Sequence, residues 1–295
     1  MNLITEIFKT IKSIFLIPIN ISSISENMKD LKLIENKIDL LTQKVNDLTM
    51  KSTLEKQEKR FLCQELSESE KLQISNEIST VFENHFLQIE ALLSIYNSLP
   101  NLKFMPATRG WAGSPDFLNK IVETILKQKP HFVLEVSSGV SSVLIGLALK
   151  RINSGKALSL ENDFLFLEKT RKNIDLNDLE DISIIMDCPL CDYLIDGETW
   201  KWYETNELTI TDKIDLLIID GPPRSTQSLA RYPAIPLLYK YFSDNVFILL
   251  DDAKRPDEII IIDKWIQFLE KEGCKITIER YVNYEKGLVL LSVKK

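Results

Sequence analysis

The sequence predicts an α/β protein in which an open, mostly parallel sheet follows a long helical extension. From about residue 130 onward, short apolar runs alternate with segments of helical periodicity, which is the pattern of successive βαβ units. Before that region, apolar side chains recur at spacings of three and four, which is typical of helices. A chain of 295 residues has room for one sizeable α/β domain and an appendage.

Composition and charge narrow the class of protein. A hydrophobic content of 44% and a charged content of 27% are typical of soluble globular proteins. The net charge of −7 provides no basic field, so we expect no nucleic-acid partner. The four cysteines include one CxxC pair, Cys188 and Cys191, and are otherwise scattered, which fits a reducing, cytoplasmic compartment. With no second such pair and two histidines, a zinc site is not expected.

Residues 1–22 are predicted to form an amphipathic N-terminal helix that stops at Pro18. One face carries apolar side chains, and Lys9 and Lys12 lie opposite; the apolar set is Ile4, Ile7, Phe8, Ile11, Ile14 and Phe15. Such a helix either lies on a membrane surface as a peripheral contact or packs on a partner or on its own domain. We therefore expect a cytoplasmic protein, with membrane association through this helix left open.

Residues 23–60 are predicted to form a coiled coil. Apolar residues repeat every seven positions in two sets: Ile24, Leu31, Ile38 and Val45 form the first, and Ile34, Leu41 and Leu48 form the second. A repeat of about 3.5 residues over several heptads is typical of helices that associate, so we expect a homo-oligomer. The largely β-branched first set favours a parallel dimer, and a trimer stays open. A single exposed helix is the alternative, although it would leave this stripe in water.

Residues 75–295 are predicted to form the main domain. It opens with an amphipathic helix over residues 78–96 and a compact loop, in which Ser114 is suited to cap a helix whose first residue is Pro115. Trp111 in this loop either covers a ligand or packs at the domain edge. The expected strands are residues 132–136, 157–161, 182–186, 214–220, 246–251, 275–281 and 287–293, and the expected later helices are 141–148, 163–173, 226–241 and 257–272. The last two strands should pair antiparallel, because no helix separates them.

Small residues and acids follow the expected strands. Residues 137–139 form a small-residue loop between strand and helix, which in open α/β sheets lets a nucleotide-like ligand contact the backbone, although an ordinary turn has the same pattern. Glu161 ends the second strand about twenty residues later, a spacing that suits two vicinal ribose hydroxyls. Asp187 ends the third strand, Asp220 the fourth, and Asp251 and Asp252 the fifth. Parallel strands bring these acids to one rim of the sheet.

Several short motifs follow one another along this domain. They are WAGSPDFL at 111–118, LEVSSGVSS at 134–142, SLEND at 159–163, IDGPP at 219–223, LARYPAIPLL at 229–238, LLDDAKRPDE at 249–258 and EKGLVLL at 285–291. On these motifs, the chain from about residue 109 onward resembles the class I S-adenosylmethionine-dependent methyltransferases, in particular the branch with a DGPP turn after strand four. The resemblance implies a seven-stranded Rossmann-like sheet of order 3-2-1-4-5-7-6, with strand seven antiparallel. It does not extend to the N-terminal helices.

The resemblance also implies roles for residues at the rim. The cofactor-binding set is Glu135, Ser137, Gly139, Ser141, Glu161, Asn162 and Asp187. Its first four members would line the methionine and ribose end of S-adenosylmethionine, Glu161 would hold the ribose, and Asp187 would lie near the adenine. Ser137 departs from the glycine usual in the family, so a positive φ there would strain the backbone.

We therefore expect an S-adenosylmethionine-dependent methyltransferase that acts on an oxygen of a sugar, a glycan or another small hydroxylated acceptor. Asp220 and Asp252 are the catalytic candidates. Asp220, Asp251 and Asp252 match positions that hold a divalent cation in some oxygen-methylating relatives, which makes Mg²⁺ a candidate ligand; helix capping and substrate binding are alternatives. Arg231 either binds an anionic substrate or is structural. The alternative function is a catalytically inactive methyltransferase-like oligomeric scaffold.

Overall fold

The computed structural model describes residues 32, 35–40, 42–47, 49–53, 67–108, 110–205 and 212–295. The chain divides into two compact units, Met1–Ser79 and Thr80–Lys295. The predicted N-terminal helix and most heptad positions lie outside the described residues. Ile38 and Val45 are described, are helical and are about half exposed, so the coiled coil stays a prediction. No described helix combines the length and apolar character needed to cross a membrane.

Helix α3 (Glu68–Ser98) is longer than the sequence pattern predicts. The pattern predicts a helix over residues 78–96, but residues 68–77 are helical as well, because their Glu, Lys, Leu and Gln residues favour helix. Helix α4 (Pro115–Gln128) begins where expected, with Ser114 at the N-cap position. The Ser114 hydroxyl donates to Asp116 Oδ1 at 2.6 Å instead of bonding the helix backbone.

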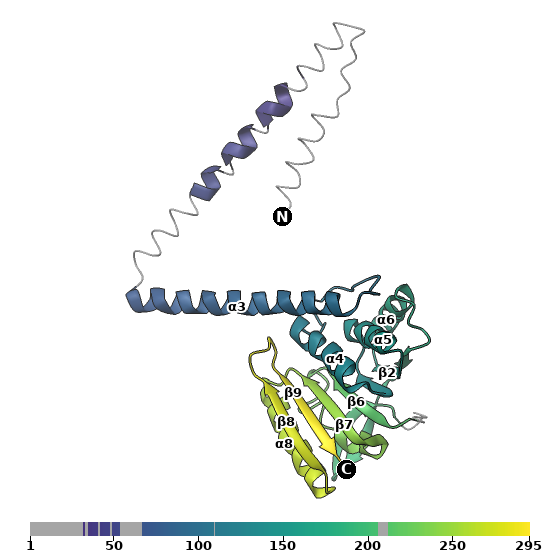
Figure 1. Ribbon diagram of the computed structural model, residues 1–295. Coiled ribbons are helices and arrows are strands. Elements are labelled where there is room, and N and C mark those ends of the chain that lie inside the picture. Colours follow the sequence, from purple (N-terminus) through teal and green to yellow (C-terminus); the bar gives the residue numbers. More distant parts are fainter. Residues whose placement is uncertain are drawn as a thin grey trace, which may run out of the picture. The chain divides into compact units, whose positions relative to one another are not determined.

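The second unit is built on the predicted seven-stranded sheet (Figure 1). Its strands are β1 (Phe132–Val136), β2 (Lys156–Glu161), β3 (Ser183–Asp187), β6 (Ile214–Ile219), β7 (Phe242–Asp251), β8 (Lys275–Tyr281) and β9 (Leu288–Lys294). Their order is β3-β2-β1-β6-β7-β9-β8, and β9 runs antiparallel to both β7 and β8. Counted along the chain within this sheet, the order is 3-2-1-4-5-7-6, which confirms the prediction.

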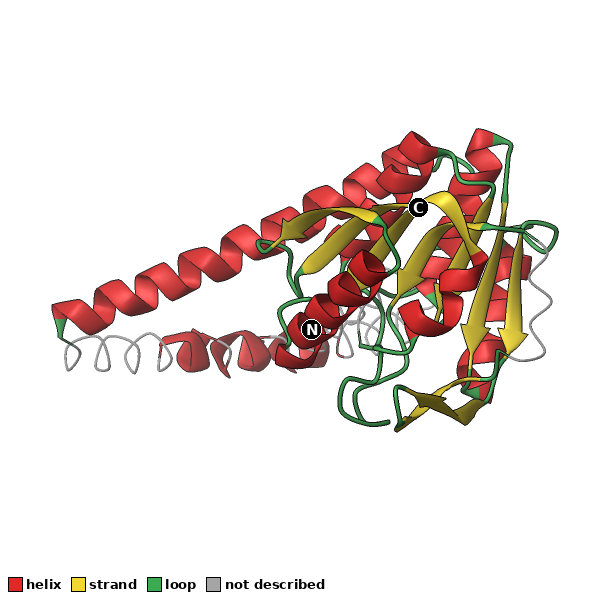
Figure 2. Cartoon of the chain, turned by 90° about the horizontal axis from the view of Figure 1, so that it is seen from below, coloured by secondary structure: helices red, strands yellow, loops and turns green. Residues whose placement is uncertain are grey.

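Helices cover both faces of this sheet (Figures 1 and 2). The buried apolar side chains form two clusters, one on each face. Helices α4, α5 (Val140–Ile152) and α6 (Phe164–Leu176) contribute to one cluster, whereas α7 (Ala234–Leu238) and α8 (Pro256–Lys271) contribute to the other. All five residues of β1 are buried, with Val133 in one cluster and Leu134 in the other. Burial on both faces therefore explains why this strand is apolar apart from Glu135.

The prediction of a helix over residues 226–241 is wrong for most of these residues. The structure has turns up to Pro233, then the short α7 and a 3₁₀ helix over Tyr239–Tyr241. Pro233 and Pro236 have no backbone N–H, and each disfavours the helical conformation of the residue before it. Leu229 has a φ of 52°, which is incompatible with a continuous helix.

A two-stranded antiparallel hairpin follows β3, and the strands assigned from the sequence do not include it. It consists of β4 (Leu190–Ile195) and β5 (Glu198–Tyr203), joined by Asp196 and Gly197 with φ of 52° and 82°. An Asp-Gly pair between two such runs is a known signal of a tight hairpin turn, so the sequence did contain this information. The hairpin adds aromatic side chains, Trp200, Trp202 and Tyr203, to the core cluster on the α7–α8 face.

Candidate active site

The five parallel strands bring the predicted acids to one rim of the sheet. Glu161 and Asp187 are register partners at the ends of β2 and β3. Val136, the last residue of β1, is the register partner of Leu160 on one side and of Ile219 on the other. The loop after β1 therefore lies between Glu161 and Asp220, as the strand order requires.

The loop after β1 has an unusual backbone. Ser137 has a φ of 107°, a region that glycine normally occupies, so the serine at this position carries strain. Its N–H donates to Leu160 O at 3.0 Å, which fixes the loop on β2. A Cβ atom built on Gly139 would meet nothing within 4 Å. The backbone at Gly139 thus borders open space in which a ligand could approach it closely.

Glu135 holds this loop from beneath. Its Oε2 accepts hydrogen bonds from Ser142 at 2.6 Å and from Ser159 at 2.5 Å, and the Ser142 hydroxyl accepts one from Gly139 N at 3.1 Å. Burial raises the pKa of Glu135 to about 7, although hydrogen bonds from these serines and from Ser141 act in the opposite direction. Because the side chain is fully buried, Glu135 supports the loop, and its direct contact with a cofactor stays a prediction.

Glu161 lies at the opposite side of the loop. Its Oε2 accepts from the Ser138 hydroxyl at 2.8 Å, and its Oε1 accepts from Asp163 N at 2.9 Å. A carboxylate has about four acceptor sites, so each oxygen retains one for a ligand hydroxyl. Asn162 is half-buried and Asp187 is exposed at the same edge. The sequence-predicted ribose and adenine residues therefore lie together beside the loop.

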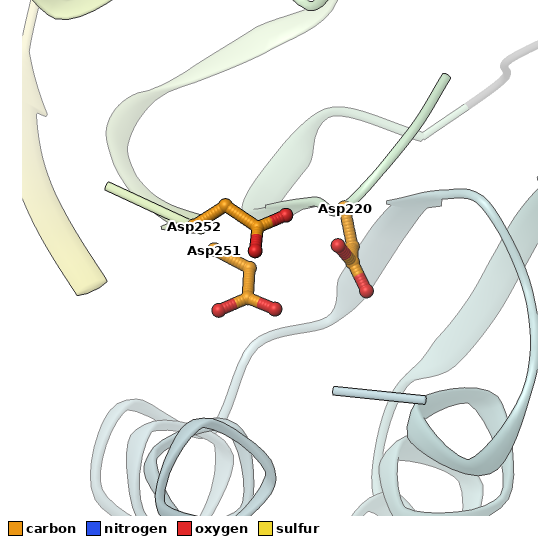
Figure 3. A group of neighbouring side chains, drawn as sticks. All are labelled: Asp220, Asp251 and Asp252. Atoms are coloured by element: carbon orange, nitrogen blue, oxygen red, sulfur yellow. The ribbon is translucent and has the colours of Figure 1, made fainter. Parts of the chain in front are cut away.

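The three candidate metal ligands also come together (Figure 3). Ligand oxygens of Asp220, Asp251 and Asp252 lie within 4.8 Å of one another. Asp251 is fully buried, and Lys286 Nζ lies 3.9 Å from its Oδ2. Burial raises the pKa of Asp251 well above its ordinary value, and the neighbouring carboxylates of Asp220 and Asp252 raise it further.

The guanidinium of Arg231 lies inside this cluster. Its Nη2 donates to Asp220 Oδ1 at 3.0 Å and to Asp252 Oδ2 at 2.8 Å. Nη2 also donates to Asp220 O, and Nη1 donates to Asp251 O, both at 2.9 Å. The side chain is 4% exposed, so it cannot reach a substrate in solution. Arg231 thus joins the ends of β6 and β7, which agrees with the structural alternative.

Tyr203 lies between the loop and the aspartate cluster. A Cβ atom built on Gly221 would lie 2.5 Å from the Tyr203 hydroxyl oxygen. The same position is 3.0 Å from Ser137 Cβ. Burial raises the pKa of Tyr203 well above its ordinary value, Glu161 and Asp220 raise it further, and Arg231 lowers it. The tyrosine is therefore close to both halves of the rim. The sequence assigned it no role, because only the hairpin brings it there.

Trp111 does not pack at the domain edge, since its side chain is 80% exposed. The carbonyl of the next residue, Ala112, accepts a hydrogen bond from Lys286 Nζ at 3.0 Å. Lys286 Nζ also lies 3.9 Å from Asp251 Oδ2, so this loop is tied to the aspartate cluster. The alternative in which Trp111 covers a ligand stays open.

No protein-family model matches the sequence, and no curated protein matches it. Among solved structures, the chain is similar to the O-methyltransferase from Bacillus cereus in complex with SAH, at 16% identity and a TM-score of 0.47, over 73% of this chain and 91% of that chain. A putative O-methyltransferase from Klebsiella pneumoniae is similar at 16% identity and a TM-score of 0.49, over 72% and 96%. A putative caffeoyl-CoA O-methyltransferase from Staphylococcus aureus is similar at 12% identity and a TM-score of 0.48, over 74% and 100%.

The class of fold follows from the sheet itself. An order of 3-2-1-4-5-7-6 with an antiparallel last strand is the Rossmann-like methyltransferase fold, here formed by the unit Thr80–Lys295. In such open sheets, ligands bind at the carboxyl ends of the parallel strands. The loop, Glu161 and the aspartate cluster all lie at that rim.

Proposed function

We propose that this protein is an S-adenosylmethionine-dependent methyltransferase that methylates an oxygen of a small hydroxylated acceptor, such as a sugar or a glycan. The observation that carries the proposal is the convergence of Gly139, Glu161 and Asp220 on one rim, with Tyr203 close to Glu161 and Asp220. A purely structural role for these groups explains each of them singly, but it does not explain why they converge at the ligand-binding edge of this sheet.

The residues at the rim fit the cofactor. The open space at Gly139 gives room for a ligand against the backbone, and Glu161 retains acceptor sites suited to ribose hydroxyls. Ser137, Ser141, Asn162 and Asp187 would complete the binding set, and Glu135 would hold the loop in place. When bound, the cofactor supplies a methyl group already activated on a sulfonium.

The protein would then align the acceptor hydroxyl and remove its proton. Asp220 is the candidate proton acceptor, because its side chain is 16% exposed while those of Asp251 and Asp252 are nearly inaccessible. Burial raises the pKa of Asp220, whereas the charge of Arg231 lowers it, so burial makes its carboxylate a stronger base than a free aspartate. Asp252, bonded to both Arg231 and Arg255, would orient the arginine that holds Asp220.

Mg²⁺ remains the candidate metal for Asp220, Asp251 and Asp252, whose oxygen donors are of the type it prefers. Two of the oxygens that would bind it already accept hydrogen bonds from Arg231 Nη2. Mg²⁺ requires nearly ideal octahedral geometry, and an ion shared by these two oxygens would lie against the fixed positive charge of Arg231. The residues therefore do not fit the ion well, and no step of the proposed reaction uses it.

Calorimetric titration with S-adenosylhomocysteine tests the proposal. We expect saturable binding to the wild type and at least about tenfold weaker binding to Glu161→Ala, which corresponds to the loss of one or two hydrogen bonds. Glu168→Ala is the matched control, because Glu168 is an exposed carboxylate whose ion pair is with Arg171 on the same helix. Absence of binding to the folded wild type, or equal affinity in Glu161→Ala, would contradict the proposal.

One observation favours a second candidate, an oligomeric scaffold without catalytic activity. The strained Ser137 stands where a glycine would adopt the same φ without strain, which is what loss of selection for cofactor binding would produce. A scaffold would lose its partner on deletion of residues 1–60, whereas an enzyme would keep its affinity for S-adenosylhomocysteine. The same titration, repeated on that deletion variant, separates the two functions.

A further inference from the structure

We propose that the guanidinium of Arg231 is the resident cation of the Asp220–Asp251–Asp252 cluster and excludes a divalent ion from it. The inference deepens the proposed function, since it describes how Asp220 is held. Its test measures cation binding, however, and does not depend on methyl transfer.

The geometry of the guanidinium supports this assignment. Nη2 lies 3.0 Å from Asp220 Oδ1 and 2.8 Å from Asp252 Oδ2, so a single nitrogen bridges carboxylates that follow two different strands. The carbonyl oxygens of Asp220 and Asp251 accept the further hydrogen bonds described above. An ion shared by Asp220 and Asp252 would have to displace this nitrogen or lie against a fixed positive charge.

The charge of the surroundings leads to the same conclusion. Four carboxylates, those of Asp220, Asp251, Asp252 and Glu258, meet three cations, those of Arg231, Arg255 and Lys286. One formal negative charge remains when all four acids are ionised. Adding a divalent ion would reverse the sign and leave a net positive charge around carboxylates whose side chains are at most 16% exposed, which is costly.

The fold keeps Arg231 in position. The turn that carries it is fixed on both sides: Leu229 N donates to Asp257 Oδ2 at 3.3 Å, and Trp265 Nε1 donates to Tyr232 O at 2.8 Å. An arginine also stays protonated at any ordinary pH, so its charge is permanent. Arg231 is therefore a positioning residue that ties the end of β6 to the end of β7 and orients Asp220.

The test is a calorimetric titration of the full-length protein with Mn²⁺ and with Mg²⁺, together with thermal unfolding in each ion. We expect no saturable binding to the wild type at millimolar ion and an unchanged Tm. In Arg231→Met the side chain keeps its length but loses its charge. We expect the Tm to fall by about 5 °C or more, and Mg²⁺ to restore part of the loss, because the freed carboxylates now bind it.

Arg255→Met is the matched control. Arg255 also contacts Asp252 and Glu258, at 2.8 and 3.8 Å, but it is 40% exposed, and among the described residues its ion pairs do not include Asp220. We expect no gain of ion binding there, because Arg231 still occupies the cluster. Should Arg231→Met fail to fold, Arg231→Lys replaces it: a retained charge predicts that no ion binds.

Saturable Mg²⁺ or Mn²⁺ binding to the wild type that is lost in Asp220→Asn would overturn the inference. So would a folded Arg231→Met that gains no affinity for either ion. If S-adenosylhomocysteine fails to bind while the two ions behave as expected, the proposed function fails and the role of Arg231 stands.

Discussion

At the rim, one residue has a strained backbone and another supports the same loop through hydrogen bonds. Ser137 adopts a glycine-like φ of 107°, and the buried Glu135 holds the same loop through Ser142. Strain of this kind persists when the surrounding structure determines the backbone more strongly than the local sequence does. Here the hydrogen bond from Ser137 N to Leu160 O and the chain of hydroxyls to Glu135 provide that determination.

Replacing Ser137 by glycine should stabilise the protein. Relief of strain at this φ is worth about 1–3 kcal/mol, which exceeds the cost of about 0.5–1 kcal/mol for the greater freedom of glycine in the unfolded chain. Urea unfolding measures the difference. Ser138→Gly is the control, because it removes the hydrogen bond to Glu161 and should destabilise the protein instead. A Ser137→Gly variant less stable than the wild type would contradict the inference that the backbone at Ser137 is strained.

Glu135 should give the free energy of unfolding a pH dependence. Its pKa is about 7 in the folded protein and 4.5 in the reference state, so between these values the folded state binds more protons than the unfolded state. Stability therefore falls as pH rises from about 4.5 to 7, by up to about 3 kcal/mol from this group. The difference between wild type and Glu135→Gln, followed by urea unfolding from pH 5 to 8, isolates it. A pH-independent difference would refute the assignment.

At the level of elements, the β4–β5 hairpin connects the two halves of the rim. Its last residue, Tyr203, packs its hydroxyl against Gly221, where the chain leaves β6. Burial of Trp202 and Tyr203 in the core cluster fixes the hairpin to the α7–α8 face of the sheet. The hairpin is thus a part of the site, although it is not a strand of the main sheet.

A methyl group added at Gly221 should disturb this contact. The Cβ of Gly221→Ala would lie 2.5 Å from the Tyr203 hydroxyl and 3.0 Å from Ser137 Cβ, so we expect destabilisation of about 1–3 kcal/mol. Adding Tyr203→Phe removes the nearer atom and should recover part of that loss. A double-mutant cycle by chemical denaturation measures the coupling. Strict additivity would show that the hairpin does not press on Gly221.

At the level of the whole molecule, the second compact unit contains the complete predicted site. Every strand and every rim residue discussed above belongs to Thr80–Lys295. The predicted heptads belong to the first unit, so cofactor binding and association should be separable. This separation is what an enzyme attached to an oligomerising segment requires.

Deleting residues 1–66 should reduce the oligomeric state and leave cofactor binding intact. We expect the full-length chain, of 34.0 kDa per subunit, to elute as a dimer or a trimer in size-exclusion chromatography with light scattering. The shortened chain should elute as a smaller species and bind S-adenosylhomocysteine with unchanged affinity. A full-length monomer would argue against the coiled coil.

The sequence alone determined the sheet and the placement of acids at its rim. Apolar runs such as residues 132–136 and 214–219 are local signals, and an acid that follows a parallel strand lies at the same edge as its neighbours whatever the details of packing. The placement of Asp220, Asp251 and Asp252 at one rim could therefore be predicted from the chain itself, whereas the strand order was predicted from the resemblance to the class I methyltransferases.

The tertiary structure alone decided what surrounds those acids. Arg231 contacts Asp252, 21 positions away, because the chain forms turns up to Pro233 where local periodicity predicted a helix. Tyr203 reaches the loop after β1 only through a hairpin that the sequence assignment did not include. Such contacts join segments far apart in the chain, and local spacing does not encode them. The sequence pattern predicts where the acids lie, whereas the packing of distant segments decides that Arg231 lies among them.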